Sequence, residues 1–284
     1  MMEKLFWFNL VLVLYIYLGY PALINLLALF KTSASKDDVR GETDGLPSVS
    51  ILIAAYNEEK DIKATIINKT ELDYPGDRLE ILVVSDESTD ATDAIVKELA
   101  EESDISIRLF RQKPRRGKTS GLNMIVPEAK GEIIVFSDAN SIYHKDALNR
   151  LVANFYDAEV GYVTGKMVYT NPDGSLVGDG CSSYMKYENW MRSKETILGS
   201  VVGVDGGIDA MRRGLYEPLR ADQLPDFVQP LKVVEKGFRV VYEPEAILKE
   251  DALSNAASEY TMRVRVTLRA LWALKDMRFL FNPF

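Results

Sequence analysis

A long apolar run opens the chain. The stretch from Leu5 to Phe30 passes 26 residues without a charged side chain, which exceeds the roughly 20 residues that a helix needs to cross a bilayer. Tyrosines and a tryptophan lie within it, and it lacks the small-x-small cleavage site of a signal peptide. The pattern predicts a transmembrane anchor over residues 1–31, kinked at Pro21. A cleaved signal peptide and a buried core helix are the alternatives.

A polar, aperiodic stretch over residues 32–47 follows the apolar run and is typical of a linker. Lys4 lies on one flank of the run, whereas Lys31, Lys36 and Arg40 lie on the other. Because loops rich in Lys and Arg stay on the cytoplasmic side of a membrane, we expect a single-pass protein of the cell membrane whose main portion is cytoplasmic.

Beyond the linker, short runs rich in β-branched residues alternate with helical patterns. A strand that is followed each time by a helix predicts an α/β fold with a mostly parallel sheet and helices on both faces. Such Rossmann-like sheets bind ligands beyond the carboxyl ends of their strands. The predicted strands are residues 48–54, 80–85, 105–110 and 132–137.

Polar side chains follow three of these strands. No G-x-G-x-x-G follows the first strand and no Walker A motif is present, which disfavours an NAD enzyme and a P-loop NTPase. The residues at the strand ends are Tyr56, Asn57 and Glu58, then Asp86 and Asp90, and finally Asp138 and Asn140.

Each of these acids has a structural alternative, because Asp is a preferred N-cap residue, and for Asp90 we favour that role. Carboxylates gathered at one sheet edge nevertheless repel one another unless a cation lies between them. Mg²⁺ or Mn²⁺ that carries a ligand's phosphates needs only one or two protein carboxylates. The segment from Asp138 to Asn140 is therefore a candidate metal site.

Composition narrows the chemistry. There are 42 acidic and 34 basic residues, for a net charge of -8, which argues against a nucleic-acid partner. With one cysteine, Cys181, and one histidine, His144, the chain cannot form an internal disulfide or a Cys/His zinc cluster. Acid-base and metal chemistry must therefore use carboxylates.

Seven segments stand out in order along the chain. They are AAYNEE (54–59), VVSDESTDAT (83–92), RGKTSGLN (116–123), FSDANS (136–141), VVGVDGGIDAMRR (201–213), LPDFVQPLKVVEKGFRVVYEPEA (224–246) and EYTMRVRVTL (259–268). Together they resemble the family 2 glycosyltransferases, which are inverting enzymes of the GT-A fold that use nucleotide sugars. The resemblance is to the membrane-bound branch that includes cellulose and hyaluronan synthases, and it implies a GT-A catalytic domain over residues 48–256.

The resemblance implies a role for each matching residue. The divalent metal on the donor diphosphate would be held by Asp138 with Asn140, and the general base would be Asp226. The acceptor would lie near Asp205 and Gly206. The nucleoside of a UDP-sugar would be surrounded by Tyr56, Glu58, Asp86 and Lys118, and the diphosphate would be contacted by Arg265.

Four of these positions also suit an ordinary structural role. Asp226 is placed to cap the helix that follows it, and Asp205 to serve a glycine-rich turn. Lys118 near a helix start could simply be solvated. Residues 257–284, which contain Arg265, read as a basic amphipathic helix of the kind that lies on a membrane surface.

The chain also departs from the family pattern. Pro225 replaces the first acid before the base, and Asn140 is a neutral residue at the end of the D-x-D segment. Met262 and Val266 stand where the processive synthases have the Gln and Trp that grip a growing chain. These last two replacements indicate transfer of a single sugar or a different acceptor.

We therefore expect a membrane-anchored inverting glycosyltransferase that moves a sugar from a UDP-sugar to a polysaccharide or lipid-linked acceptor. A polyprenyl-phosphate glycosyltransferase of the same fold is the nearest alternative, because a phosphate acceptor needs less help from a base. A catalytically inactive scaffold and a periplasmic binding module are the alternatives from other classes.

Overall fold

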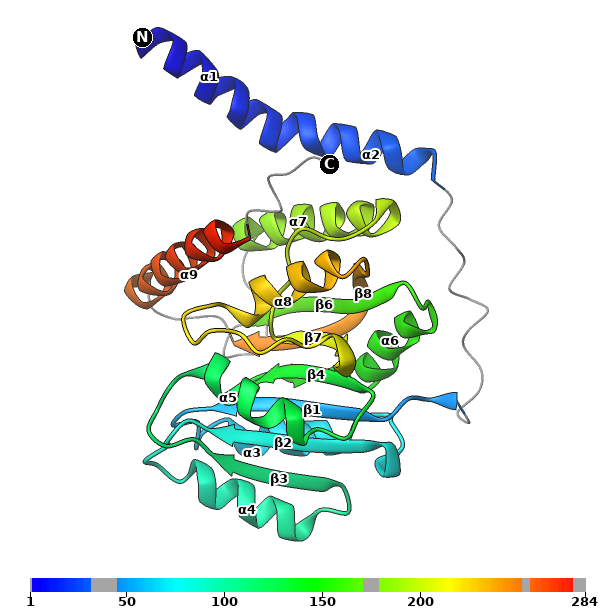
Figure 1. Ribbon diagram of the computed structural model, residues 1–284, viewed down its shortest axis with the longest axis vertical. Coiled ribbons are helices and arrows are strands. Elements are labelled where there is room, and N and C mark those ends of the chain that lie inside the picture. The colour runs from blue at the N-terminus through cyan, green and yellow to red at the C-terminus, as the bar shows by residue number, and fades with distance from the viewer. Residues whose placement is uncertain (1, 32–44, 171–178, 252–255, 278–284) are drawn as a thin grey trace.

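The computed structural model of the protein describes residues 2–31, 45–170, 179–251 and 256–277. Its described strands form one sheet in the order β3-β2-β1-β4-β7-β6-β8-β5 (Figure 1). The first four strands along the chain pair in parallel. They are β1 (Val49–Ala55), β2 (Leu79–Ser85), β3 (Ser106–Arg111) and β4 (Ile133–Asp138). The four strands that the sequence predicts are confirmed to within about one residue at each end.

The second half of the sheet is mixed. Strand β7 (Ile208–Arg212) runs antiparallel to both β4 and β6 (Val160–Thr170). Strand β8 (Arg239–Asp251) is parallel to β6, and the short β5 (Ile142–Tyr143) pairs antiparallel with β8. The expectation of a mostly parallel sheet therefore holds for the half formed by β1, β2, β3 and β4, and gives way to mixed pairing beyond β4.

Helices cover both faces of the sheet, because the alternating side chains of each strand are apolar on both sides. Ile51 and Ile53 of β1 pack into one core, and Leu52 between them packs into the other. The first core takes residues from α3 (Ile62–Thr70), α4 (Thr92–Glu102) and α6 (Ala147–Ala153). The second takes residues from α5 (Lys118–Ile125) and α8 (Pro225–Glu235). Short 3₁₀ turns lie at Gly76–Arg78, Val126–Glu128, Asn154–Tyr156 and Arg213–Leu215.

The N-terminal apolar run is one helix from Met2 to Leu29, with a mean hydropathy of 2.0 in its most apolar window. It comprises α1 (Met2–Leu14), a π-helical turn (Tyr15–Gly19) and α2 (Tyr20–Leu29). The π turn ends just before Pro21, which has no N–H to donate and crowds the preceding turn. The predicted irregularity at Pro21 thus takes the form of a π turn. This helix is long and apolar enough to cross a membrane. A signal sequence near an N-terminus can have the same length and composition.

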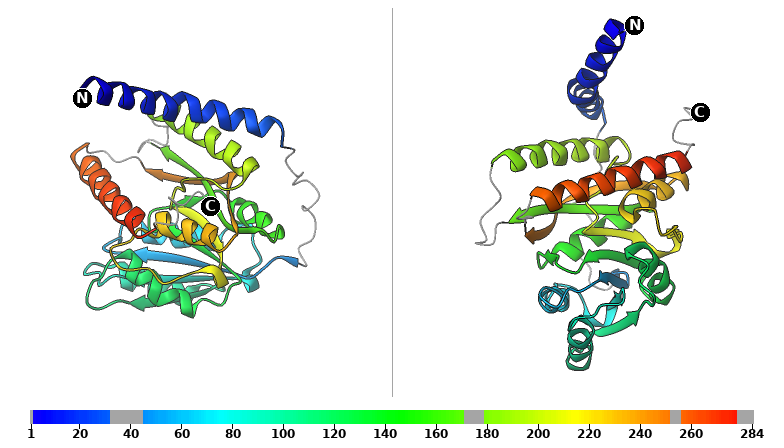
Figure 2. Two further views of the ribbon diagram at one scale, coloured as in Figure 1. Left: turned by 45° about the horizontal axis from the view of Figure 1, so that its top comes forward. Right: turned by 90° about the vertical axis from the view of Figure 1, so that its left-hand side faces the viewer.

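Helix α2 packs against α7 (Asp179–Leu198) at one end of the molecule (Figures 1 and 2). The Tyr20 hydroxyl donates a hydrogen bond of 2.8 Å to Oε1 of Glu195, a residue that is 6% exposed. Tyr187 donates from its hydroxyl to the carbonyl of Tyr17 at 3.3 Å. The apolar N-terminal helix is therefore attached to the folded domain by specific polar contacts.

The last helix, α9 (Ala256–Asp276), lies where the sequence predicts an amphipathic helix. Ala273 and Met277 pack on Val228 of α8. Leu268, Leu271 and Trp272 are exposed. An apolar strip of α9 is thus left uncovered, and contact of this strip with a membrane surface stays a prediction.

Candidate active site

Segments that are far apart in the sequence meet at the carboxyl ends of β1, β2 and β4. The Nζ atom of Lys118, the first residue of α5, lies 2.5 Å from Oδ1 of Asp138, the last residue of β4. Burial alone would lower the pKa of Lys118, but the carboxylates of Asp138, Asp226 and Asp209 raise it. Lys118 is therefore a permanent cation facing several acids, and a merely solvated lysine is excluded.

The residues at Asp138 fit a divalent cation that is held mainly by its ligand. The Asp138 side chain is 34% exposed, and the amide nitrogen of Asn140 donates to Oε1 of Glu250 at 2.8 Å, which leaves the Asn140 oxygen available. Within the part of the chain that the structure describes, no three His, Cys, Asp or Glu side chains gather closely enough to hold a metal. One carboxylate and one amide oxygen suffice for Mg²⁺ or Mn²⁺ on a diphosphate.

Glu58 also lies among several other carboxylates. Burial raises the pKa of its carboxyl, and the nearby Asp61, Asp138 and Asp90 raise it further. Asp90 itself stabilises the start of α4, because its Oδ1 accepts the N–H of Thr92 at 3.0 Å. The N-cap position is Ala91, so Asp90 is not the N-cap residue that the sequence favours and supports the helix start from one residue earlier.

Asp86 has a different role from helix capping. Its buried carboxylate accepts the backbone N–H groups of Arg116 and Gly117, each at 2.9 Å, and the side-chain amide of Gln112. These bonds fix the loop that leads into Lys118. Gly117, with φ of 86°, adopts the left-handed conformation that this loop needs.

Arg115 is a site residue that the sequence analysis missed. Its guanidinium lies 3.5 Å from the centroid of the Tyr56 ring, and its Nε lies 3.5 Å from Oδ2 of Asp86. Tyr56 is 37% exposed, and the arginine stacks on the ring as a cation–π pair. The run of basic residues before Gly117 was the available signal.

Asp226 lies in the first turn of α8, but it does not cap that helix. Leu224 occupies the N-cap position and no side-chain cap bond forms, so the capping alternative is wrong. Oδ1 of Asp226 is buried without a hydrogen-bond partner. Pro225 takes the first helical position, where the missing N–H would be unpaired in any case. The unusual proline therefore suits the start of α8.

Gly206 is in contact with Asp226. A Cβ placed on this glycine would lie 2.7 Å from Oδ2 of Asp226, and its φ of +82° also favours glycine. The adjacent Asp205 is instead held by Arg192 of α7, whose Nη1 lies 2.7 Å from its Oδ1. Both side chains of that pair are nearly buried. The structure thus brings Gly206, rather than the Asp205 carboxylate, next to Asp226.

A second missed residue is Asp209 in β7, which is only 1% exposed. Burial, together with Asp205 and Asp226, raises the pKa of its carboxyl to about 7, although the hydroxyl groups of Thr164 and Tyr162 act in the opposite sense. An acid between the apolar residues Ile208 and Ala210 was the sequence signal. The remaining predicted residue, Arg265, falls on α9, and its side chain lies outside the described residues, as does that of Met262.

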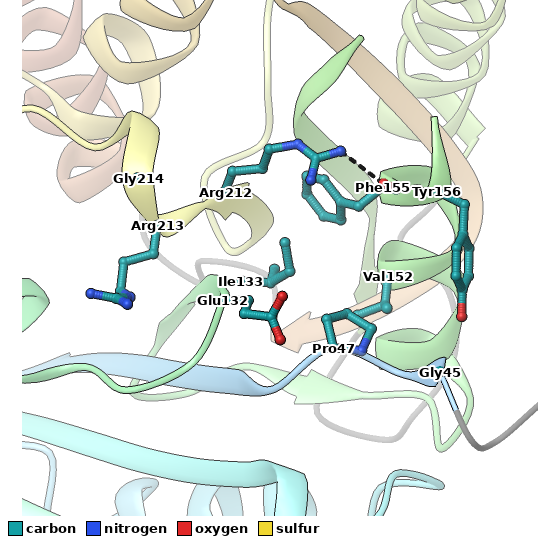
Figure 3. A pocket seen from close by; sticks show the side chains of 10 residues that line it. All are labelled: Gly45, Pro47, Glu132, Ile133, Val152, Phe155, Tyr156, Arg212, Arg213 and Gly214. Carbon is teal, nitrogen blue, oxygen red and sulfur yellow. Dashed lines mark hydrogen bonds between the residues drawn. The ribbon is translucent and has the colours of Figure 1, made fainter. Parts of the chain in front are cut away.

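A cavity of about 390 Å³ lies at the opposite end of the sheet (Figure 3). It includes Ile133, the first residue of β4, and Arg212, the last residue of the antiparallel β7. Arg212 donates to the carbonyls of Phe155 and Val160 and so supports the backbone there. This cavity is separate from the acidic cluster.

Comparison with known proteins agrees with the resemblance seen in the sequence. The family model described as glycosyl transferase family 2 matches residues 50–218. Beta-monoglucosyldiacylglycerol synthase of Nostoc sp. is 32% identical over 199 residues, which are 69% of this chain and 42% of that protein. "Probable glycosyltransferase YdaM" of Bacillus subtilis is 31% identical over 260 residues, 84% of this chain and 61% of that protein. The chain spans about half the length of these relatives.

Solved structures give the same fold. A mannosyltransferase from Pyrobaculum calidifontis, in complex with GDP-Man and Mn²⁺, is similar with a TM-score of 0.76 and 26% identity, over 94% of this chain and 74% of that one. TarS of Staphylococcus aureus in complex with UDP-GlcNAc is similar with a TM-score of 0.54 and 16% identity, over 73% of this chain and 59% of that one. The second likeness concerns the fold alone.

Proposed function

Because the chain belongs to glycosyl transferase family 2, we propose that it is a membrane-anchored inverting glycosyltransferase. It transfers a sugar from a UDP-sugar to a polysaccharide or lipid-linked acceptor. The observation that carries the proposal is that the Lys118–Asp138 pair and Asp226 meet at two adjacent glycines. A Cβ on Gly206 would lie 2.7 Å from Oδ2 of Asp226, and one on Gly207 would lie 3.6 Å from Oδ2 of Asp138. A cationic handle for phosphate and a candidate base thus lie at one end of the sheet.

The proposed donor site lies around Lys118. Asp138 and the Asn140 oxygen would hold Mg²⁺ or Mn²⁺, and the Lys118 ammonium beside Asp138 would be available to the donor phosphates. A cation held there would supply positive charge for the leaving diphosphate. The nucleoside lies near Tyr56, Glu58 and Asp86, and Arg265 contacts the diphosphate. The partly exposed Tyr56 ring and the fixed loop at Asp86 support this arrangement.

The proposed acceptor site lies at Asp226 and Gly206, next to Asp205. Inverting transfer needs a base that takes the proton of the acceptor hydroxyl as it attacks. Asp226 suits this role, because its buried Oδ1 has no partner to satisfy it. Gly206 has no side chain to block the approach to Asp226.

The proposed organisation has an anchor over residues 1–31, a linker over 32–47, the catalytic domain over 48–256 and an interfacial segment over 257–284. In this arrangement the catalytic domain is cytoplasmic. The apolar helix Met2–Leu29 and the exposed Leu271 and Trp272 support it. A lipid-linked acceptor would then meet the enzyme at the membrane surface.

Calorimetric titration tests the donor site. UDP and GDP are titrated into the detergent-solubilised full chain with Mn²⁺, Mg²⁺ or EDTA. GDP is included because the neighbour with 26% identity was solved with GDP-Man. We expect metal-dependent binding of UDP that Asp138→Ala abolishes and that Asp222→Asn, an exposed control on the loop before α8, retains. Binding of GDP without binding of UDP would indicate that the donor is a GDP-sugar. Binding of neither nucleotide would favour the inactive scaffold.

A further inference from the structure

Asp209 is a buried acid next to the proposed acceptor site. It lies in the middle of the sheet, in register with Phe136 of β4 on one side and Thr164 of β6 on the other. At 1% exposure it is withdrawn from water. A buried carboxylate is costly unless it is hydrogen-bonded or paired. Among the described residues, no lysine or arginine forms an ion pair with it.

Hydrogen bonds hold one oxygen of Asp209 and leave the other free. Oδ2 accepts the Tyr162 hydroxyl at 2.8 Å and the backbone N–H of Gly206 at 3.1 Å. Oδ1 is buried with no partner. Tyr162 is itself 1% exposed, so its hydroxyl depends on Asp209. The buried Asp209 carboxylate thus joins the buried Tyr162 hydroxyl to the backbone N–H of Gly206.

That glycine touches the proposed base. On one side Gly206 donates its N–H to Asp209, and on the other its Cα faces Asp226 so closely that a Cβ would lie 2.7 Å from Oδ2. Asp226 also has a buried oxygen without a partner. No hydrogen bond on Oδ1 therefore sets the orientation of the Asp226 side chain. Its packing against Gly206 must help to set that orientation.

We propose that Asp209 is a positioning residue for Asp226. By holding the Gly206 amide, it fixes the backbone surface on which the Asp226 carboxylate lies, and so directs that carboxylate toward the acceptor. This inference rests on the proposed function of Asp226 as the base. A small displacement of a reacting group lowers a rate steeply, so a residue that acts only through Gly206 affects the acceptor step and leaves the donor site unchanged.

The charge of Asp209 varies near neutral pH, because burial raises the pKa of its carboxyl to about 7. The charged groups that influence it or face the same cluster are Asp205, Asp226, Asp138 and Lys118. Both protonation states keep Oδ2 available as an acceptor. The positioning role therefore does not depend on which state is present.

Three variants of the full chain test the proposal. In Asp209→Ala we expect kcat/KM for the acceptor to fall at least about tenfold, while the Kd for the donor nucleotide stays within about twofold. Asp209→Asn keeps an oxygen that accepts both hydrogen bonds, so it restores most of the activity. Tyr162→Phe keeps the hydrogen bond between Gly206 and Asp209, so we expect its kcat/KM for the acceptor to lie between the values of Asp209→Ala and Asp209→Asn. Ser50→Ala, which removes buried hydrogen bonds at the other end of the sheet, is the control and keeps acceptor kinetics.

Hydrogen–deuterium exchange gives a readout that does not need turnover. In Asp209→Ala we expect faster exchange in the segment 201–208 than in wild type, and unchanged exchange in the segment 116–125. Wild-type acceptor kinetics together with unchanged exchange in Asp209→Ala would overturn the proposal. So would an equal loss of donor affinity, or an Asp209→Asn variant as impaired as Asp209→Ala. Absence of turnover in the wild type would refute the proposed function instead, and exchange would still decide the anchoring of Gly206.

Discussion

Lys118 and Asp138 form an ion pair of 2.5 Å between the first residue of α5 and the last residue of β4. The two residues are 20 positions apart, and neither is fully buried. Asp226 and Asp209 also raise the pKa of Lys118. One cation thus balances the acids of both the proposed donor site and the proposed acceptor site, which makes its removal informative.

Lys118→Met is predicted to weaken donor binding. Without the ammonium group, less positive charge offsets the repulsion between the donor phosphates and Asp138. We therefore expect the affinity for the nucleoside diphosphate to fall about tenfold or more, which corresponds to about 1.4 kcal/mol of binding free energy. Calorimetric titration with saturating Mn²⁺ measures this. Lys232→Met, which removes a lysine paired with Glu235 on the surface of α8, is the control. Equal affinity of Lys118→Met and wild type would contradict a role in phosphate binding.

Asp226→Asn is predicted to lose turnover and to keep donor binding. The amide cannot take a proton from an acceptor hydroxyl, and loss of a general base typically costs about 10²- to 10⁴-fold in rate. Initial rates with a saccharide or lipid-linked acceptor, together with the donor Kd, separate the two effects. Near-normal turnover would favour a phosphate acceptor, as in a polyprenyl-phosphate glycosyltransferase. Asp222→Asn, an exposed acid four positions earlier, should behave like wild type.

The first half of the fold was predictable because its strands carry a local signal. Residues such as Ile51, Leu52 and Ile53 form continuous apolar runs that are typical of a strand covered on both faces. Polar residues or glycines interrupt the apolar residues of β6 and β8: β6 contains glycine and lysine, and β8 contains glutamate and lysine. Their pairing depends on where β7 enters the sheet, which is a long-range event without a local pattern.

Within the candidate site, the meeting of the strand ends was predictable but the partners of the side chains were not. Asp86, Lys118 and Asp138 had to lie near one edge once the parallel order was known. The pairing of Asp205 with Arg192, by contrast, joins a loop to a helix on a different layer. Asp209 lies only three residues after Gly206, but the hydrogen bond from the Gly206 N–H to its Oδ2 depends on the turn between them, which the apolar pattern does not show.

Tyr20→Phe is predicted to loosen the N-terminal helix from the folded domain. Glu195 is 6% exposed and loses the hydroxyl that donates to its Oε1, and a buried acceptor left without its partner costs about 1–3 kcal/mol. The melting temperature in one fixed detergent should fall, with faster hydrogen exchange in α7. Tyr15→Phe alters an exposed tyrosine of the same helix and serves as the control. Identical melting of Tyr20→Phe and wild type would show that this contact does not stabilise the docked helix.

Asp209 is predicted to make stability fall as pH rises. Its folded pKa of about 7 exceeds the ordinary value of 3.8, so between these values the folded chain binds more protons than the unfolded chain. Stability from this group is therefore complete below about pH 4 and is lost as pH rises to about 7. At 1.36 kcal/mol per pKa unit the effect is at most about 4 kcal/mol.

Asp209→Asn has no such titration, so the difference in unfolding free energy between variant and wild type should shift in favour of the variant between about pH 5 and about pH 8. Chemical unfolding at both pH values measures it, with Ser50→Ala as a control that keeps the wild-type pH dependence. A parallel pH dependence in Asp209→Asn and wild type would mean that the buried acid is already charged at pH 5, and that its cost is met by contacts other than those with Tyr162 and Gly206.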